Sequence, residues 1–583
     1  MSVAIWPDHS PRRRISSSSV VTLVPMKIMP LAAAVLLTAT TVTTPAQADP
    51  VPDLHPCATA TKRCDGKLSV PLNWDDPNSE RIEVAFAWLP AKKAERTIFA
   101  HLGGPTQSLE SLPGVEQVLG PLLERSNLLV MDIRGFGKST ILNCDYLKMG
   151  DLESIKRCAA ELGPRAAHFS SSQTADDLNA IRTALGIDKL HLFGNSYGTF
   201  IGQTFAARHP KTVSAMLLDS MGVIGKGGYF YHQHRPRLKN LEVVCDRSRA
   251  CRDLPSTPVA TWTRTLDRLR AKPDPELPVK VFAHVGLQAS HSVVAKEVNA
   301  AATAYLAGDL APLRRLGKEV GSPDWKPEED LPDRTAELAY NCADVEMPFD
   351  RSAPVEERKR QFARYHAKER PSQPYERSEY PFVGREEACV YWPQAANRPP
   401  APPELPHPDV PVMSINGEFD FHAPDVVRAA IKRYPRGTFR PVPAAWHAMG
   451  FTPEPTGSCV RAAMQKFLSK PTHPAPEARC TAETYKAIGA YPRALRDITP
   501  ARASGLTGRE RTLVAAALAT AEDAVARRNP HAHFGHQSLK DSTGLRGGTM
   551  TFGKDTIELD RFATWTVSRS RARSASERRP RPI

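Results

Sequence analysis

Long apolar runs are almost absent from this chain of 583 residues. Beyond the first fifty residues, none is long and apolar enough to cross a bilayer. The chain also lacks a Cys-x-x-Cys pair and any cluster of histidines, so we expect neither a metal nor another cofactor. The formal net charge is +14, but +3 of it lies in residues 1–48 and +5 in residues 568–583. The remaining +6 is too diffuse to predict a nucleic-acid partner.

Apolar material for a buried core is plentiful. Hydrophobic residues make up 41% of the chain and charged residues 24%, which excludes global disorder. The length allows about three domains, or one large domain with a sizeable insertion. The 53 prolines indicate long loops and extended connections.

The first fifty residues are typical of an export signal. An apolar stretch at residues 29–44 is followed by Ala46-Gln47-Ala48, a small-x-small cleavage site. We therefore expect residues 1–48 to be a signal peptide, and the mature chain to be secreted, extracellular or periplasmic, without stable membrane insertion. Two alternatives stay open: translation could start at Met26, or residues 12–14 could belong to a degenerate twin-arginine signal.

The cysteines agree with export, because their number is even and none precedes the expected cleavage site. Pairing them in order gives separations of 7, 14, 6, 47 and 21 residues, which would close only short loops. We expect five disulfides, although the sequence alone leaves their connectivity open. The ten residues are Cys57, Cys64, Cys144, Cys158, Cys245, Cys251, Cys342, Cys389, Cys459 and Cys480.

Strand and helix patterns alternate through residues 49–225. Continuous apolar runs at 127–132, 190–193 and 213–219 are typical of strands buried on both faces, and residues 174–185 and 199–208 have helical spacing. This order predicts an α/β fold with a mostly parallel sheet and helices on both faces.

The alternation is interrupted at residues 226–405, which read as charged helices separated by proline-rich turns. The strand pattern resumes at 410–416, within a second core segment that we place at 406–480. Residues 226–405 are therefore predicted to be a helical cap inserted between two strands, over the carboxyl ends of the sheet where open α/β sheets bind ligands.

A Gly-x-Ser-x-Gly motif, Gly194-Asn195-Ser196-Tyr197-Gly198, directly follows a predicted strand and directly precedes a predicted helix. This context is typical of a nucleophile elbow, in which small residues on either side of the serine allow a strained turn that projects its hydroxyl. Ser196 is therefore the predicted nucleophile.

A serine nucleophile needs a base and an acid that orients it, in the chain order serine, acid, histidine. Asp420 follows the strand at 410–416, and His447 follows the next predicted strand. We expect Asp420 to hold His447 in the correct tautomer, and His447 to accept the proton of Ser196. The alternatives are Asp425 and His422, while we interpret Glu418 as a solvated loop acid.

An oxyanion hole requires two backbone N–H groups. We expect one from Tyr197, which follows the nucleophile, and the second from Gly104, with Gly103 as the alternative. Both glycines lie in His101-Leu102-Gly103-Gly104-Pro105, after a predicted strand at 97–101.

These motifs together resemble the prolyl aminopeptidase and tripeptidyl aminopeptidase branch of the α/β-hydrolases. The resemblance rests on residues 103–105, 132–139 (DIRGFGKS) and 194–199, and residues 389–392 and 416–420 are more similar to secreted tripeptidyl-aminopeptidase-like members. It implies an α/β-hydrolase fold with a helical cap, and an exopeptidase acting on free N-termini. The family's His-Gly-Gly-Pro-Gly is replaced here by His-Leu-Gly-Gly-Pro-Thr.

An aminopeptidase must recognise a substrate ammonium group, and carboxylates match it chemically. If Cys342 is bridged to Cys389, Asp344 and Glu346 would approach two glutamates at 386 and 387 on the cap. We therefore predict Asp344 and Glu346 as amine anchors, with a solvated acidic surface as the alternative.

Residues 481–567 predict a helix followed by a small β appendage, which we expect to pack on the hydrolase body. Residues 568–583 form an arginine-rich tail that is predicted to be disordered, and that could contact anionic surfaces.

Three functions fit these patterns. A secreted serine hydrolase that cleaves short peptides or single residues from free N-termini is preferred. An esterase or other acyl hydrolase with the same residues is the alternative, and a non-catalytic envelope binding protein is the third reading, because a fold alone does not fix a function.

Overall fold

The computed structural model describes residues 54–148, 151–225, 234–287, 292–320, 334–376, 379, 383–394, 399–400, 407–452, 456–480, 487–527, 541–553 and 556–564. The predicted signal peptide and the predicted basic tail lie outside these residues. Among the described residues, no helix combines the length and the apolar character needed to span a membrane.

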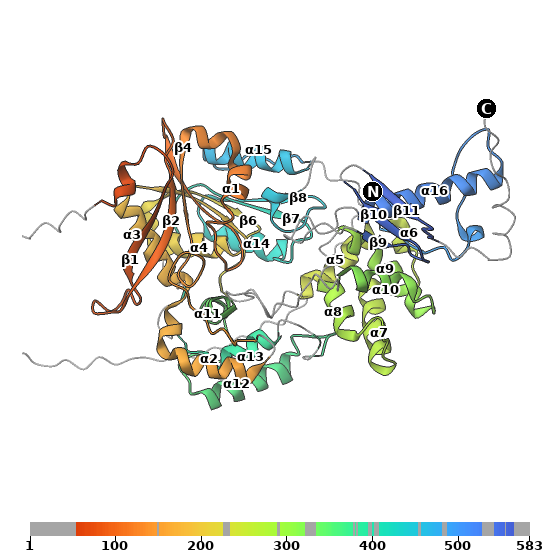
Figure 1. Cartoon of the computed structure of the whole chain (residues 1–583), viewed down its shortest axis with the longest axis horizontal. Helices are drawn as coiled ribbons and strands as arrows, with labels where there is room; N and C mark the ends of the chain where they lie inside the picture. The colour runs from red at the N-terminus through yellow and green to blue at the C-terminus, as the bar shows by residue number, and fades with distance from the viewer. Residues whose placement is uncertain are drawn as a thin grey trace, which may run out of the picture. The chain divides into compact units, whose positions relative to one another are not determined.

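An eight-stranded sheet organises the chain, in the order β1-β2-β4-β3-β5-β6-β7-β8 (Figure 1). Strand β2 runs antiparallel to both of its neighbours, and every pair from β4 to β8 is parallel. The strands are β1 (Cys64–Pro71), β2 (Arg81–Leu89), β3 (Arg96–His101), β4 (Ser126–Met131), β5 (Leu190–Asn195), β6 (Val213–Asp219), β7 (Val412–Gly417) and β8 (Gly437–Val442). The mostly parallel sheet that the apolar runs predict is confirmed.

Helices cover both faces of this sheet, because each strand buries side chains on both sides. Leu192 and Met216 join one apolar cluster with α3 and α4, while Phe193 and Leu217 join the opposite cluster with α1 and α15. The helices around the sheet are α1 (Leu112–Leu119), α2 (Leu152–Leu162), α3 (Ser171–Ala184), α4 (Gly198–Arg208), α14 (Pro424–Ala430) and α15 (Thr456–Ser469).

Nine further helices lie between β6 and β7 among the described residues, and they pack as two groups. Helices α5 and α7 to α10 build a core of their own around Trp262, Phe282 and Leu313. Helices α11 to α13 join the core of the sheet, through residues such as Tyr340 of α11 and Trp392, which directly follows α13. The helices are α5 (His234–Asp246), α6 (Arg249–Arg252), α7 (Pro258–Ala271), α8 (Val279–Leu287), α9 (Ser292–Leu306), α10 (Ala311–Val320), α11 (Arg334–Asp344), α12 (Val355–Glu369) and α13 (Val383–Tyr391).

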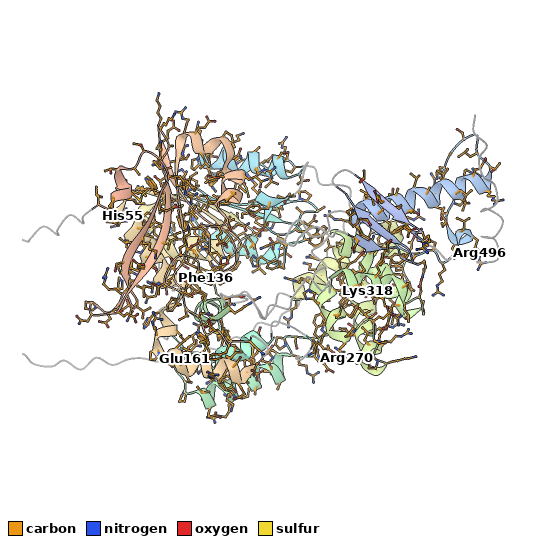
Figure 2. The ribbon with its side chains drawn as sticks, viewed as in Figure 1. His55, Phe136, Glu161, Arg270, Lys318 and Arg496 are labelled. Carbon is orange, nitrogen blue, oxygen red and sulfur yellow. A yellow bond between two sulfur atoms is a disulfide. The ribbon has the colours of Figure 1, made fainter. Side chains whose placement is uncertain are left out.

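An ion pair joins the first of these groups to the segment between α12 and α13. Arg270 of α7, labelled in Figure 2, donates to both carboxylate oxygens of the buried Glu379, at 2.9 and 2.7 Å. Guanidinium and carboxylate thus meet in a two-point geometry that fixes their orientation.

The C-terminal segment contains α16 (Gly508–Arg527) and a small antiparallel sheet of β9 (Asp541–Thr543), β10 (Thr549–Phe552) and β11 (Ile557–Asp560). Its contacts correct the expectation that it packs on the hydrolase body. Arg527 of α16 bonds to Glu297 of α9 and Glu319 of α10, so the segment packs on the inserted helices. Arg527 lies more than 200 positions from both glutamates, so no local sequence pattern predicts this packing.

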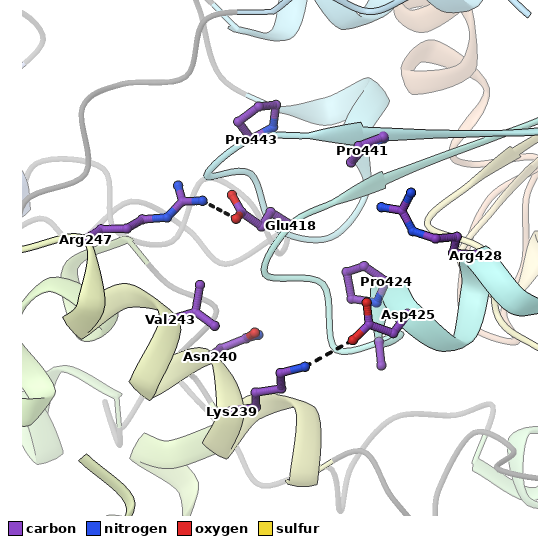
Figure 3. A pocket seen from close by; sticks show the side chains of 11 residues that line it. Lys239, Asn240, Val243, Arg247, Glu418, Pro424, Asp425, Arg428, Pro441 and Pro443 are labelled. Atoms are coloured by element: carbon purple, nitrogen blue, oxygen red, sulfur yellow. Dashed lines mark hydrogen bonds and ion pairs between the residues drawn. The ribbon is translucent and has the colours of Figure 1, made fainter. Parts of the chain in front are cut away.

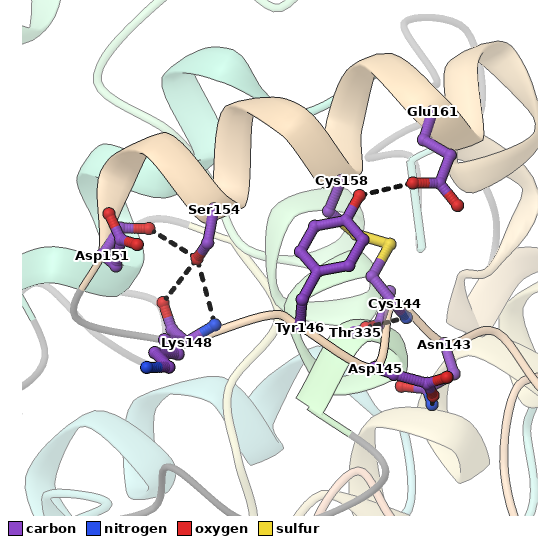
Figure 4. The surroundings of a disulfide bond; sticks show 10 residues. All are labelled: Asn143, Cys144, Asp145, Tyr146, Lys148, Asp151, Ser154, Cys158, Glu161 and Thr335. Atoms are coloured by element: carbon purple, nitrogen blue, oxygen red, sulfur yellow. Dashed lines mark hydrogen bonds between the residues drawn. A yellow bond between two sulfur atoms is a disulfide. The ribbon is translucent and has the colours of Figure 1, made fainter.

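All five disulfides are present, and they join the cysteines in sequential order, with separations of 7, 14, 6, 47 and 21 residues. The expectation of five disulfides is confirmed. Cys144–Cys158 ties the loop after β4 to α2 (Figure 4), and the backbone N–H of Cys144 donates to Thr335 Oγ1 of α11 at 2.9 Å.

Candidate active site

Ser196 occupies a sharp turn between β5 and α4, with φ of +51° in the left-handed region. The flanking glycines are required by close packing. A Cβ on Gly198 would lie 1.9 Å from the carbonyl oxygen of His101, and a Cβ on Gly194 would lie 2.4 Å from the carbonyl oxygen of Gly198. Any larger residue would push the helix away from the strand, so the glycine spacing is what allows the strained turn.

The structure brings Ser196, His447 and Asp420 together. His447 Nε2 lies 2.8 Å from Ser196 Oγ, and His447 Nδ1 lies 2.9 Å from Asp420 Oδ1. Because a carboxylate only accepts hydrogen bonds, Nδ1 carries the proton, and Nε2 accepts the hydrogen bond from the serine hydroxyl. The three groups therefore have the geometry that nucleophile activation requires.

Asp420 is fully buried, yet its surroundings keep its carboxyl group ionised. Burial alone would raise the pKa of its carboxyl, but the neighbouring His447 and the backbone N–H of His422, 2.8 Å from Oδ1, outweigh burial and hold the pKa below its usual value. An ionised Asp420 can fix the imidazole and stabilise its protonated form.

The rival residues have hydrogen-bond partners other than the serine. His422 donates through Nδ1 to the carbonyl of Ser220 at 2.9 Å, and burial lowers its pKa to about 4. Asp425 is exposed in α14 and bonds to Lys239 at 3.1 Å. Glu418, which the sequence predicts to be a solvated loop acid, is partly buried: it accepts from the N–H of Ala444 at 2.9 Å and pairs with Arg247.

Asp420, His422 and His447 are residue types that commonly bind metal ions, and they lie close enough together to form a metal site. Ligand atoms of Asp420, His422 and His447 lie within 4.8 Å of one another. Hydrogen bonds to the protein already engage the Nδ1 atoms of both histidines, and His447 Nε2 faces Ser196. The arrangement therefore fits a proton relay better than a cation.

A second buried carboxylate, Asp219 at the end of β6, ties the nucleophile turn to the histidine loop. It accepts from the N–H groups of Met449 and Gly450 at 2.8 and 2.9 Å and from Asn195 Nδ2 at 2.8 Å. Its carbonyl accepts from the N–H of Ser196 at 2.9 Å. Burial raises the pKa of Asp219 to about 6, although these donors oppose the rise. In the sequence, Asp219 reads only as the end of an apolar strand.

The predicted oxyanion segment lies against the nucleophile. A Cβ on Gly103 would lie 3.1 Å from Ser196 Cβ, which is a tight contact that the neighbouring atoms could accommodate only by shifting slightly. Gly104 has φ of +119°, which a residue with a side chain rarely adopts. Tyr197 follows Ser196 at the start of α4, as its position in the motif requires. The assignment of its N–H and that of Gly104 as donors remains a prediction.

The predicted amine anchors lie in different environments. Cys342 is bonded to Cys389, as the argument for these residues required. Asp344 is nevertheless buried, accepting from the N–H of Ser171 at 3.1 Å and from the hydroxyl of Tyr197. It is therefore not a cap-surface acid, because α11 directs it into the core. Glu346 is exposed, so its role stays a prediction.

A cleft of about 430 Å³ separates α5 from the loops that follow β7 and β8 (Figure 3). Two ion pairs cross it, Lys239–Asp425 and Arg247–Glu418. Asn240 Nδ2 also donates to the carbonyl of Phe419 at 2.6 Å. The inserted helix α5 is thus bonded directly to the loop that carries the acid of the site.

Comparison with protein families supports the fold. Residues 101–227 match the model of the alpha/beta hydrolase fold, a segment that includes the nucleophile turn. The thermophilic esterase of Thermogutta terrifontis is a structural neighbour, with 16% identity and a TM-score of 0.30, over 70% of this chain and 98% of that chain.

Two curated relatives are peptidases by name. The serine protease Hip1 of Mycobacterium tuberculosis is 34% identical over 181 residues, and the tripeptidyl aminopeptidase of Streptomyces lividans is 26% identical over 186 residues. The alignments cover 26% and 27% of this chain, and about a third (35%) of each relative's length.

Proposed function

From the α/β-hydrolase fold of this chain, we propose that it is a serine hydrolase, and specifically an exopeptidase that releases short peptides or single residues from free N-termini. The observation that carries the proposal is the continuous chain of hydrogen bonds from Ser196 through His447 to Asp420. These three side chains come from the ends of three different strands, and a structural role alone would not require them to meet around one hydroxyl.

In the proposed reaction, His447 Nε2 takes the hydroxyl proton while Ser196 Oγ attacks the substrate carbonyl. The N–H groups of Tyr197 and Gly104 would stabilise the oxyanion that develops. His447 then gives its proton to the leaving amine. In the second half of the reaction, His447 takes a proton from the water that attacks the acyl-enzyme and gives it to Ser196 Oγ as the acid product leaves. Asp420 keeps Nδ1–H of His447 oriented throughout.

The named relatives support peptides rather than esters as substrates, since one is a serine protease and another a tripeptidyl aminopeptidase. The exposed Glu346 is the remaining candidate for binding the substrate ammonium group. An esterase with the same three residues is the second candidate, because the cap and the pocket, not the triad, choose the substrate.

We also propose that the chain acts outside the cytoplasm. Five disulfides among the described residues favour an oxidising compartment. The leader at residues 1–48 and the arginines of residues 568–583 supply the proposed export signal and a proposed contact with anionic surfaces.

A panel of chromogenic substrates tests the function. Wild type and Ser196→Ala are assayed with tripeptides and single amino acids that have free N-termini, with N-blocked peptides and with short-chain esters. The proposal predicts turnover of the free peptides that is lost in Ser196→Ala. Turnover of esters or blocked peptides alone favours the second candidate, and no turnover that depends on Ser196 favours a binding protein.

A further inference from the structure

Tyr197 directly follows the nucleophile in the chain, and its side chain is held by contacts with Asp344, Phe200 and Tyr340. Its hydroxyl donates to Asp344 Oδ2, its ring stacks on Phe200 with centroids 5.6 Å apart, and Tyr340 meets it edge-on at 6.1 Å. Tyr197 is 2% exposed, so these contacts enclose it. Because its backbone N–H is the proposed oxyanion donor, whatever fixes the ring also fixes the orientation of that N–H.

Asp344 is held as firmly as the tyrosine. Both of its carboxylate oxygens accept from the N–H of Ser171, at 3.1 and 3.2 Å, at the first turn of α3. A carboxylate is stabilised there because the first N–H groups of a helix point at it and the helix dipole favours negative charge. Asp344 therefore has one fixed position from which to accept the hydroxyl of Tyr197.

Asp344 comes from the inserted helices rather than from the sheet. It is the last residue of α11, and the disulfide Cys342–Cys389 joins this helix to α13 two residues earlier. Tyr340 of the same helix donates to the carbonyl of Arg134 at 3.1 Å and bonds to Thr174 of α3 at 2.6 Å. Helix α11 is thus fastened at two positions in the turn that precedes Asp344.

We propose that Asp344 is a positioning residue that fixes the oxyanion donor of Tyr197 through the tyrosine hydroxyl. The inserted helix α11 thereby sets the geometry of the catalytic corner, by which we mean the turn at Ser196 together with the loops that carry Asp420 and His447. The proposal rests on the serine-hydrolase function proposed above. It replaces the prediction that Asp344 binds the substrate amine, because a side chain enclosed by Ser171 and Tyr197 has no surface to offer a substrate.

A double-mutant cycle tests this role through Tyr197→Phe, Asp344→Asn and the double variant. The readouts are kcat and KM for a substrate that wild type turns over, and the rate at which a fluorophosphonate labels Ser196. A misplaced donor weakens transition-state binding, so each single variant is expected to lose about 10- to 100-fold in kcat and labelling rate, with little change in KM.

The double variant is the decisive measurement. If Asp344 acts through the tyrosine hydroxyl, the second substitution adds less than about threefold to the loss caused by the first. Multiplicative losses, or losses in KM alone, would overturn the positioning role.

Thr335→Val is the matched control for a merely structural effect. Thr335 is also buried in α11, nine positions before Asp344, and its hydroxyl accepts a backbone hydrogen bond from Cys144 at 2.9 Å (Figure 4). It is expected to lower thermal stability while leaving kcat within about twofold of wild type.

Fluorophosphonate labelling distinguishes this inference from the proposed function. Wild type that is folded but unlabelled at Ser196 would refute the function, and the inference with it. Rapid labelling of wild type together with unchanged rates in Tyr197→Phe and Asp344→Asn would refute the inference alone.

Discussion

The catalytic corner and the C-terminal segment both bury carboxylates, but they stabilise them in opposite ways. Asp219 at the corner is surrounded by neutral donors, the N–H groups of Met449 and Gly450 and the amide of Asn195, and burial raises its pKa to about 6. Glu297 under α16 faces Arg527 and Arg315; burial would raise its pKa, but the guanidinium groups hold it below the usual value.

The difference teaches how each region is specified. In both regions the partners are distant in sequence: Met449 and Gly450 lie 230 and 231 positions from Asp219, and Arg527 lies 230 positions from Glu297. The difference is in the chemistry of the donors, which are neutral amide N–H groups at the corner and guanidinium groups under α16. At the corner, burying the carboxylate of Asp219 without a cationic partner costs free energy, but its hydrogen bonds hold the nucleophile turn and the histidine loop in place. Under α16, oppositely charged side chains attach the C-terminal segment to the inserted helices.

The largest expected effect is on kcat, when the acid of the catalytic corner is replaced. Asp420→Asn removes the acceptor that fixes Nδ1–H of His447, and kcat should fall about 10⁴-fold, as expected when the histidine takes the wrong tautomer. Steady-state kinetics on a cleaved substrate measure the loss. Asp425→Asn, at an exposed position of α14, is the matched control and should stay near wild type. A loss of less than tenfold in Asp420→Asn would mean that this carboxylate is not the acid of the site.

The next largest effect is expected on the stability of the contact between the C-terminal segment and the inserted helices. Arg527→Met removes the guanidinium shared by the buried Glu297 and the partly buried Glu319 and Asp523, which should destabilise this region by about 3–5 kcal/mol. Hydrogen exchange resolved to α16 measures the change. Arg561→Met, which removes an exposed pair with Asp560, should cost less than about 1 kcal/mol. Similar protection of α16 in both variants would refute the paired-charge account.

A smaller effect compares the two regions through pH. With its pKa raised to about 6, Asp219 binds more protons in the folded state, so its contribution to the free energy of unfolding falls by up to about 3 kcal/mol as pH rises from 4 to 6. Glu297, with a lowered pKa, contributes stability that is present above the unfolded value of 4.5 and lost as pH falls below it.

Thermal unfolding of wild type, Asp219→Asn and Glu297→Gln across pH 3.5–7 measures both contributions. The stability of wild type relative to Asp219→Asn should decrease with rising pH, and that relative to Glu297→Gln should increase. Slopes of the same sign would show that the two regions do not differ as described.

The sequence predicts the site better than it predicts the supports of the site. Ser196, Asp420 and His447 could be named because each follows an apolar strand, and parallel strands bring their carboxyl ends to one edge. The sequential disulfides could be anticipated because they close short loops. Asp219 reads only as the end of an apolar run, because its partners Met449 and Gly450 lie 230 and 231 positions later. Asp344 is predicted as an amine anchor on the cap, because its partner Tyr197 lies 147 positions earlier. Contacts of this range leave no local pattern.

The central claim, that Ser196 is a nucleophile activated by His447, is tested most directly by trapping the acyl-enzyme. Wild type, Ser196→Ala and His447→Ala are mixed with a p-nitrophenyl ester, quenched in acid within milliseconds to seconds, and digested for peptide mass spectrometry. The account predicts one acyl group per wild-type chain on the peptide that contains Ser196, and none on that peptide in either variant. Acylation at another residue, or acylation of Ser196 at the wild-type rate in His447→Ala, would contradict it.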